Sequence, residues 1–197
     1  MSNDFLNVPG PRRNRYLLMR HAHSQANERG LIISDPRHGL GDYGLSAEGE
    51  AQLARLVAEW SWPAPTRIHH SDFLRTTQTA ARVAEHFGLS PIPEPRLRER
   101  HFGACEGRSS DLYPSVWTLD ERDPAHRARG VEPVVAVAAR MQAVMEELDG
   151  AFTGETILLV SHGDPLQILL TALEGRPLSQ HRKRSALMPA SVTPVGD

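Results

Sequence analysis

Two short apolar segments, far apart in the chain, each lead directly to a histidine. Residues 15–20 read Arg-Tyr-Leu-Leu-Met-Arg and are followed by His21. Residues 156–160 read Thr-Ile-Leu-Leu-Val and are followed by Ser161 and His162. Both segments are too short for a stable helix, and their continuous apolar character is typical of a buried strand. We therefore expect two buried strands, each with a histidine at its carboxyl end.

Helical patterns alternate with the strands along the chain. The expected elements are, in order, a helix capped by Ser46 and stopped by Pro63, a short strand over 66–70, a helix over 72–87 closed by Gly88, a helix that begins at Pro133, and a helix from about Asp164 to Leu173. Strands that alternate with helices in this way predict an α/β domain with a largely parallel sheet.

The remaining segments predict loops. Residues 28–44 contain several glycines, and residues 89–132 are rich in Pro, Arg and Asp, so both are expected to be irregular. With 197 residues, we expect a single domain over 1–197. Within it, residues 1–14 predict a flexible leader, and 109–132 predict a cap or insert over a pocket, to which Tyr113 and Trp117 would belong.

Charge and composition narrow the functional classes. The formal net charge is −2, so bulk charge does not indicate binding to nucleic acid or membranes. One cysteine, Cys105, allows neither an intrachain disulfide nor a cysteine-based zinc site. The N-terminal residues lack the apolar core of a signal peptide, and no segment approaches the roughly 20 apolar residues of a membrane span. These features predict a cytoplasmic protein.

The candidate functional residues cluster around the two predicted strand ends. In open α/β sheets, ligands bind outside the carboxyl ends of the strands, so His21 and His162 are expected to face one pocket. Arg20 adjoins the first histidine, Arg75 lies early in the helix over 72–87, and Glu99 lies in the following loop. The candidate set is therefore two histidines, two arginines and one carboxyl group.

This set of side chains suits phosphoryl transfer. Arginine forks match phosphate oxygens, and a neutral imidazole can attack phosphorus to form a covalent intermediate. A protonated carboxyl group can give its proton to the departing alkoxide and, once ionised, can activate water. Nothing in this scheme requires a metal ion or a cofactor, and we expect none.

Five blocks of sequence resemble the motifs of the histidine phosphatase superfamily, also called phosphoglycerate mutase-like, and they occur in that family's order. The blocks are Leu18-Met-Arg-His-Ala-His-Ser-Gln-Ala-Asn27, Leu45-Ser-x-x-Gly49-x-x-Gln52, Ser71-Asp-Phe-Leu-Arg-Thr-x-Gln-Thr-Ala80, Leu97-Arg-Glu99-x-x-Phe-Gly103-x-x-Glu-Gly107 and Val160-Ser-His-Gly163. The resemblance extends from Leu17 to about Leu173. It implies a three-layer α/β/α sandwich with a mostly parallel sheet.

The resemblance also implies a role for each matching residue. His21 is expected to accept the phosphoryl group and Glu99 to donate the proton. The phosphoryl oxygens are expected to be held by Arg20, Arg75 and His162, with further contacts from Asn27 and the backbone of Gly163. The sequence departs from the pattern at Ala22, where the family usually has glycine. If that position needs a left-handed backbone, alanine costs about 1 kcal/mol.

Several other residues were considered for the site. His23 is expected beside the pocket, where it helps to select the substrate, and His101 and Cys105 are expected near the site without taking part. The spacing of His69, His70 and Asp72, or of His162 and Asp164, matches no named zinc motif, so we expect no metal site. The basic run at residues 182–184 is interpreted as solvated surface, with attraction of an acidic substrate tail as the alternative.

The resemblance implies an enzyme that hydrolyses a small phosphate monoester and leaves two alternatives open. The family includes mutases, which return the phosphoryl group to a bound substrate instead of to water. The short segment over 109–132 and the 35 residues after His162 favour a phosphatase. The remote alternative is a non-catalytic phosphate-binding module. The expected partner is a small phosphorylated metabolite, without nucleic acid or membrane, and a homodimer is left open.

Overall fold

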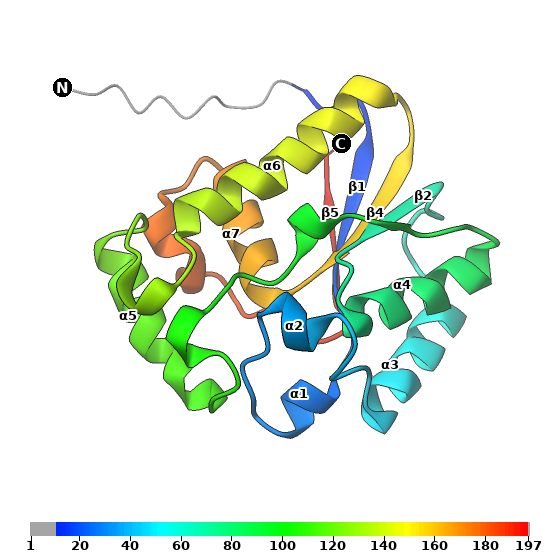
Figure 1. Cartoon of the computed structure of the whole chain (residues 1–197). Helices are drawn as coiled ribbons and strands as arrows, with labels where there is room; N and C mark the ends of the chain where they lie inside the picture. Colours follow the sequence, from blue (N-terminus) through cyan, green and yellow to red (C-terminus); the bar gives the residue numbers. More distant parts are fainter. Residues whose placement is uncertain (1–10, 197) are drawn as a thin grey trace.

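The two strands that lead to histidines lie side by side at the centre of one sheet in the computed structural model, which describes residues 11–196 (Figure 1). Strand β1 (Arg15–Arg20) pairs in parallel with β4 (Thr156–Ser161), and their last residues are direct partners. Because parallel strands end at the same edge of a sheet, the pairing brings the two following histidines together.

The sheet has five strands in the order β3-β2-β4-β1-β5. Strand β2 (Arg67–His70) is parallel to β4 and to β3 (Ile92–Pro93), as a largely parallel sheet requires. Strand β5 (Val192–Val195) is antiparallel to β1 and forms one edge. Pro194 lacks the N–H that a central ladder needs, which fits an edge position.

Helices cover both faces of this sheet and complete the predicted three-layer α/β/α sandwich (Figure 1). Alternate residues of a strand point to opposite faces. Leu18 of β1 therefore packs with α6 (Val134–Ala151) and α7 (Gly163–Leu173). Leu17 packs instead with α3 (Ala47–Ala58) and α4 (Leu74–Phe87) on the other face. The observed layers and the mostly parallel sheet confirm the expected fold class.

The predicted helix ends agree with the structure to within a few residues. Ser46 precedes α3, and its side-chain oxygen accepts a hydrogen bond from the N–H of Gly49 at 3.2 Å. Gly88 follows α4 with a left-handed backbone, φ 66°, which glycine adopts without steric cost. Pro133 stands directly before α6.

The segment over 89–132 is not wholly irregular, and in that respect the prediction was wrong. It contains α5 (Tyr113–Arg122), whose buried residues are Val116 and Asp120. The loop expected over 28–44 also holds a short helix, α2 (Pro36–Gly39), and α1 (Gln25–Glu28) precedes it. Short 3₁₀ turns occur at Pro95–Leu97, Gly103–Cys105, Ser110–Leu112, Ala128–Gly130 and Leu178–Lys183.

Helix α5 lies to one side of the sandwich, beyond the carboxyl ends of the central strands (Figure 1). Val116 packs in a small apolar cluster of its own with Ile32, Phe102 and Cys105. The segment over 109–132 therefore attaches to the loops that follow β1 and β3 rather than to the sheet itself. This is the position that a cap over a strand-end pocket requires.

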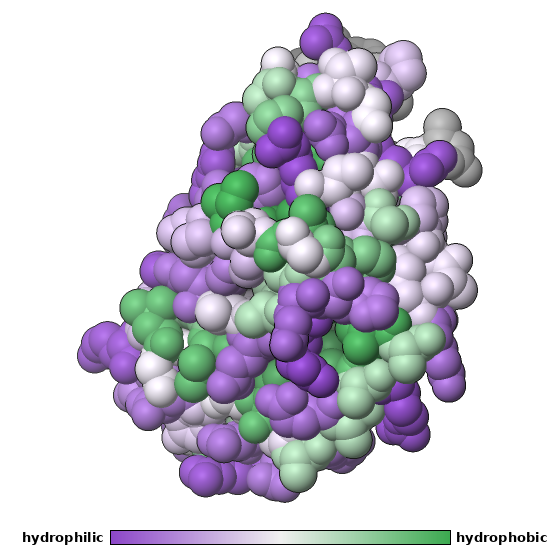
Figure 2. All heavy atoms as spheres, turned by 90° about the vertical axis from the view of Figure 1, so that its right-hand side faces the viewer, coloured by the Kyte–Doolittle hydropathy of each residue, from purple (hydrophilic) through white to green (hydrophobic). Residues whose placement is uncertain are grey.

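Residues 1–10 of the predicted leader lie outside the described residues. Immediately before β1, Asn14 is buried; its amide donates to the carbonyl of Phe152 at 3.0 Å and its side-chain oxygen accepts from the N–H of Glu155 at 3.0 Å. None of the helices within residues 11–196 is long and apolar enough to cross a membrane. On the side shown in Figure 2, hydrophobic residues are interspersed with hydrophilic ones.

Candidate active site

His21 lies directly after β1, and its ring is held in one orientation. The ring is buried, and Nδ1 lies 2.7 Å from the carbonyl oxygen of Ala22, so Nδ1–H donates there. The other nitrogen, Nε2, accepts a hydrogen bond from Nε of Arg75 at 3.3 Å. The two bonds together fix the tautomer in which Nε2 carries the lone pair.

His162 lies at the start of α7, and its ring centroid is 5.2 Å from that of His21. Its Nε2 lies 2.8 Å from the hydroxyl oxygen of Ser71, the residue that follows β2. We assign the Ser71 hydroxyl as the donor to Nε2, which places the proton of this imidazole on Nδ1. Three adjacent strands, β1, β4 and β2, are thus followed directly by His21, His162 and Ser71. Ser71 was not predicted as part of the site.

Two arginines approach His21 from different elements. Arg75, in the first turn of α4, is buried, and its Nη2 donates to the carbonyl of Ile33 at 2.9 Å. Arg20, the last residue of β1, donates from Nη1 to the carbonyl of Leu187 at 2.5 Å. A Cβ on Gly163 would lie 3.3 Å from Nε of Arg20, so the small residue there makes room for this side chain.

Three buried N–H groups around His21 have no hydrogen-bond partner within the described part of the chain. They are Nε of Arg20, Nη1 of Arg75 and Nδ1 of His162. A buried donor without a partner costs free energy on the order of 1–3 kcal/mol, so three in one place point to a ligand that satisfies them. The ligand that fits two cationic donors and one neutral donor is an anion with several oxygens.

Burial controls the protonation of the two histidines. It lowers the pKa of His21 well below its ordinary value, and the nearby charges of Arg75 and Arg20 lower it further. Burial and then Arg75 lower the pKa of His162 in the same direction. Both rings are therefore neutral at neutral pH. Burial also lowers the pKa of Arg20 and of Arg75, but a guanidinium remains protonated there.

Glu99 supplies the carboxyl group of the site. Its side chain is largely buried, Oε1 accepts from the N–H of Arg100 at 2.9 Å, and Oε2 lies 4.0 Å from Nδ1 of His162. Burial raises the pKa of Glu99 from 4.5 to about 7, although the charge of Arg75 opposes this shift. Near neutral pH the same group can therefore give up a proton and later take one back.

Most of these groups line a cavity of about 110 Å³, whereas His162 is fully buried behind it and is not part of its wall. Arg20, His21, Arg75, Glu99 and Asn27 all lie in its wall, together with Tyr113 of α5 and Ser110. The oxygen of the Asn27 side chain accepts from the N–H of Ser24 at 3.0 Å in the cap of α1. Its amide N–H₂ group is left to donate to a ligand in the cavity.

A second cavity, of about 230 Å³, adjoins the first one at Glu99. It shares Arg20, Glu99 and Tyr113 with the first cavity, but His21 does not line it. Its other walls are formed by Trp117 of α5, by Gly163, Asp164 and Gln167 of α7, and by Arg182, Ala186 and Leu187. Gly163, predicted to contact the phosphoryl group, lines this second cavity instead of the first.

Arg182 corrects the expectation that residues 182–184 are solvated surface. Its guanidinium carbon lies 3.6 Å from the ring centroid of Trp117, and its side chain is 26% exposed. Because Arg182 stacks on Trp117 and lines the second cavity, one of the three basic residues belongs to the site. No sequence signal marks which of three adjacent basic residues points inward.

The structure answers the question left open at Ala22 and corrects the expectation for His23. Ala22 does not have a left-handed backbone, so alanine in place of glycine causes no strain there. The Nδ1 of His23 lies 2.7 Å from the hydroxyl oxygen of Ser46 at the start of α3, and His23 lines neither cavity. His101 and Cys105 also lie outside both cavity walls.

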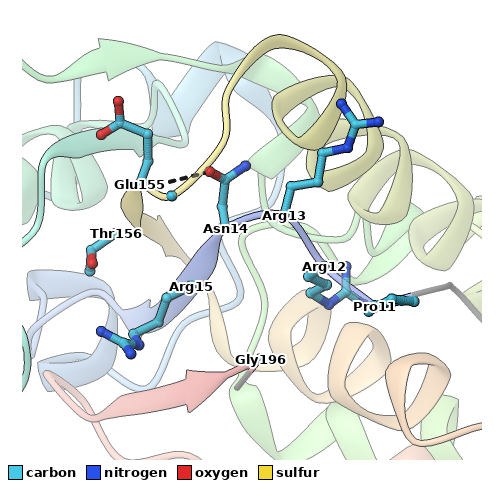
Figure 3. Close-up of a pocket in the computed structure, with 9 residues that line it drawn as sticks. Pro11, Arg12, Arg13, Asn14, Arg15, Glu155, Thr156 and Gly196 are labelled. Carbon is cyan, nitrogen blue, oxygen red and sulfur yellow. Dashed lines mark hydrogen bonds between the residues drawn. The ribbon is translucent and has the colours of Figure 1, made fainter.

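The described residues offer no group of three or more His, Cys, Asp or Glu side chains placed to hold a metal ion. Another cavity, of about 310 Å³, lies at the opposite end of β1 (Figure 3). Arg13 and Arg15 extend from it in opposite directions, so they do not converge on one ligand (Figure 3). Of these three cavities, the two at the carboxyl end of the sheet contain the predicted catalytic residues His21 and Glu99.

A family model and several known proteins match most of the chain. The family model of the histidine phosphatase superfamily (branch 1) matches residues 16–196, a span that contains every residue of the two cavities at the sheet's carboxyl end. A probable phosphoglycerate mutase of Photorhabdus laumondii is 36% identical over 172 residues, which cover 84% of this chain and 77% of the relative. Phosphoserine phosphatase 1 of Hydrogenobacter thermophilus is 30% identical over 172 residues, with 84% and 79% covered.

A solved structure shares the architecture. The mycobacterial glucosyl-3-phosphoglycerate phosphatase superimposes with a TM-score of 0.77 at 26% identity, covering 91% of this chain and 88% of that one. The matching proteins thus include phosphatases and a mutase by name, and the fold alone does not separate the two.

Proposed function

This chain belongs to the histidine phosphatase superfamily, and we propose that it hydrolyses a small phosphate monoester through a phosphohistidine on His21, without a metal ion. The observation that carries the proposal is the set of three buried, unpartnered N–H donors around Nε2 of a neutral His21. A phosphoryl group brings several oxygens and a phosphorus atom that an imidazole can attack.

In the first step, Nε2 of His21 attacks phosphorus, and a P–N bond forms as the bond from phosphorus to the ester oxygen breaks. Arg20, Arg75 and Nδ1–H of His162 hold the phosphoryl oxygens as charge redistributes over them. Glu99, protonated up to about pH 7, gives its proton to the departing alkoxide. The products of this step are a free alcohol, a phosphohistidine and the carboxylate of Glu99.

In the second step, water attacks phosphorus from the side that the alcohol has left. The Glu99 carboxylate takes a proton from this water, the P–N bond breaks, and inorganic phosphate leaves. His21 returns to its neutral form and Glu99 to its protonated form. A pKa of about 7 suits a group that acts as an acid in one step and as a base in the other.

Mutase activity is the second candidate, because a relative at 36% identity is named a probable phosphoglycerate mutase. The chemistry of the first step is the same. In a mutase the phosphoryl group returns to a hydroxyl of the bound molecule, whereas in a phosphatase it passes to water. A second relative, named phosphoserine phosphatase, supports the first candidate, hydrolysis.

A turnover panel without added metal tests the proposal. Purified protein is offered a generic aryl phosphate, 3-phosphoglycerate, sugar phosphates and nucleotides, and both phosphate release and phosphoglycerate isomerisation are measured. The proposal expects phosphate release with a clear preference for one class of monoester. Isomerisation with little phosphate release would assign the chain to the mutases, and phosphate binding without turnover would support a non-catalytic module.

A further inference from the structure

The second cavity, which adjoins the first one at Glu99, is placed to receive the leaving group of the reaction proposed above. The attacking and leaving atoms lie roughly in line through phosphorus. His21 lines only the first cavity, whereas Glu99 lines both. A leaving oxygen opposite Nε2 and within reach of the Glu99 proton therefore belongs to a group that extends into the second cavity.

The size of this cavity restricts the leaving group. At about 230 Å³ it is smaller than the roughly 300–1,000 Å³ of pockets that hold drug-sized ligands. The indole ring of Trp117 is also occupied, because Arg182 lies over it at 3.6 Å and Tyr113 stacks on it with centroids 5.2 Å apart. A nucleobase or another flat ring would have to displace one of these partners, so a small aliphatic alcohol fits better.

Arg182 offers donors to such an alcohol. The hydrogen bonds that it makes within residues 11–196 come from Nη1, which donates to Oε1 of Gln167 and to Oδ1 of Asp164, the latter at 3.4 Å. The Nε and Nη2 donors remain for a ligand. They form one edge of a planar guanidinium, which is the geometry that a carboxylate accepts in a bidentate pair.

The neighbouring charges favour an anionic group over a cationic one. Asp164 is the acidic residue of the wall apart from Glu99, and its oxygens already face cations: Arg100 Nη1 at 3.2 Å from Oδ2 and Arg182 Nη1 at 3.4 Å from Oδ1. An ammonium group would find no free carboxylate there. Arg100 also pairs with Asp120 at 2.7 Å. The three arginines of this region, Arg20, Arg100 and Arg182, outnumber its two aspartates, which are the partners of Arg100. The region therefore keeps a net positive charge while Glu99 is protonated.

We propose that Arg182 is a specificity-determining residue that binds a carboxylate on the leaving alcohol, so that the preferred substrate is a phosphate monoester of a small hydroxy acid. Trp117 holds the plane of the guanidinium, and Gln167 fixes its Nη1 end. The inference rests on the proposed function, since it assumes that Glu99 protonates the alcohol at the mouth of this cavity.

The test compares two substrates that differ only in the group that Arg182 is proposed to bind. 3-Phosphoglycerate carries a carboxylate where glycerol 3-phosphate carries a hydroxymethyl group. We expect wild-type kcat/KM to favour 3-phosphoglycerate at least tenfold. In Arg182→Gln this ratio should fall about tenfold or more, mainly through KM, because a hydrogen bond to a charged group is worth an effect of that size. Arg182→Lys should give an intermediate ratio.

Lys183→Gln is the matched control. It removes the same charge from the adjacent residue, whose Nζ pairs with Glu121 at 3.2 Å and which does not line the cavity. Its substrate ratio should equal that of the wild type. Because each ratio is taken within one protein preparation, a variant that is partly unfolded does not change it.

The outcomes separate the inference from the proposed function. If Arg182→Gln keeps the wild-type ratio, or if the wild type turns over an aryl phosphate but shows no preference between the two substrates, the inference is wrong and the proposed function stands. If the wild type turns over none of the three substrates, the aryl phosphate, 3-phosphoglycerate and glycerol 3-phosphate, the proposed function fails, and the inference fails with it.

Discussion

An imidazole attacks phosphorus only through an unprotonated nitrogen, and the surroundings of His21 keep Nε2 in that state. Burial is the largest influence that lowers its pKa, followed by Arg75 and Arg20. The bond from Nδ1 to the carbonyl of Ala22 places the remaining proton away from the cavity. The protein itself thus provides a neutral nucleophile beside two fixed cations.

The pKa of Glu99 predicts an alkaline limb in the pH profile. The acid step needs the protonated carboxyl group, and the folded-state pKa is raised from 4.5 to about 7. Activity on an alkyl phosphate is therefore expected to fall as pH rises above about 7. A bound phosphate dianion moves this limb to higher pH, because its negative charge opposes ionisation of Glu99. Steady-state kcat between pH 4 and 9 measures the effect, and a decline that begins near pH 4.5 would contradict it.

Replacement of Glu99 should affect substrates according to their leaving groups. In Glu99→Gln, kcat on an alkyl phosphate is expected to fall about 10²–10⁴-fold, the usual contribution of a general acid, whereas formation of the phosphoenzyme from an activated aryl phosphate should change much less. Rapid-mixing measurement of alcohol release isolates this first step. Equal losses on both substrates would show that Glu99 is not the acid.

The sequence could predict those site residues whose position follows from the end of a strand. His21, Arg20 and His162 lie at or directly beyond strand ends, so short apolar segments were enough to place them. Ser71 was missed because a serine after a strand is common, and its bond to His162 joins residues 91 positions apart. For Arg182, contact with an acidic substrate was only the alternative to solvated surface, because its place over Trp117 depends on two segments whose packing no local pattern encodes.

At the scale of elements, a buried ion pair joins helix α5 to the loop that carries Glu99. Both terminal nitrogens of Arg100, the residue after Glu99, donate to Asp120 of α5 at 2.7 Å, and both side chains are fully buried. A third bond joins Arg100 to Asp164 at the start of α7. The pair therefore connects the Glu99 loop, the cap and the helix that follows His162.

Removal of one partner of this pair should be costly. In Asp120→Ala, a buried guanidinium loses its bidentate partner, and we expect the free energy of unfolding to fall by about 3 kcal/mol. The control is Glu85→Ala, which breaks the exposed Arg82–Glu85 pair of α4 and should cost less than about 1 kcal/mol. Denaturant unfolding compares the two, and equal losses would show that the buried pair does not anchor the cap.

The elements that the sequence missed lack the patterns on which prediction depends. Helix α5 buries a charged residue, Asp120, where a helical pattern calls for an apolar one, so its inner face was not recognised. Strand β5 contains Pro194 and forms only through pairing with the distant β1. The segments over 15–20 and 156–160 were predicted because their continuous apolar character reflects burial on both faces.

At the scale of the whole molecule, function is concentrated at one end of the sheet. The protein has a net charge of −2, yet Arg20 of β1, Arg75 of α4 and the more distant Arg182 bring three cations to two adjoining cavities. A local positive field in a nearly neutral protein attracts a small anion without general affinity for polyanions. Helix α5 closes the site from the side that the sandwich leaves uncovered.

The chemistry assigned to this end of the molecule predicts that chelators leave activity intact. The two steps need cationic donors, a neutral donor and a group that gives and takes a proton, and these are supplied by Arg20 and Arg75, by His162 and by Glu99. Turnover of an aryl phosphate is therefore expected to be the same with and without EDTA, within about twofold. Loss of turnover in the chelator that a divalent ion restores would contradict the assignment.

The most direct test of the account is to trap the covalent intermediate. Wild-type protein and His21→Ala are mixed with a labelled aryl phosphate, quenched under alkaline conditions in which phosphohistidine survives, and examined by mass spectrometry for a phosphate on a single peptide. We expect the label on His21 in the wild type and none in His21→Ala, with turnover reduced to background. Label on another residue, or turnover that persists in His21→Ala, would contradict the account.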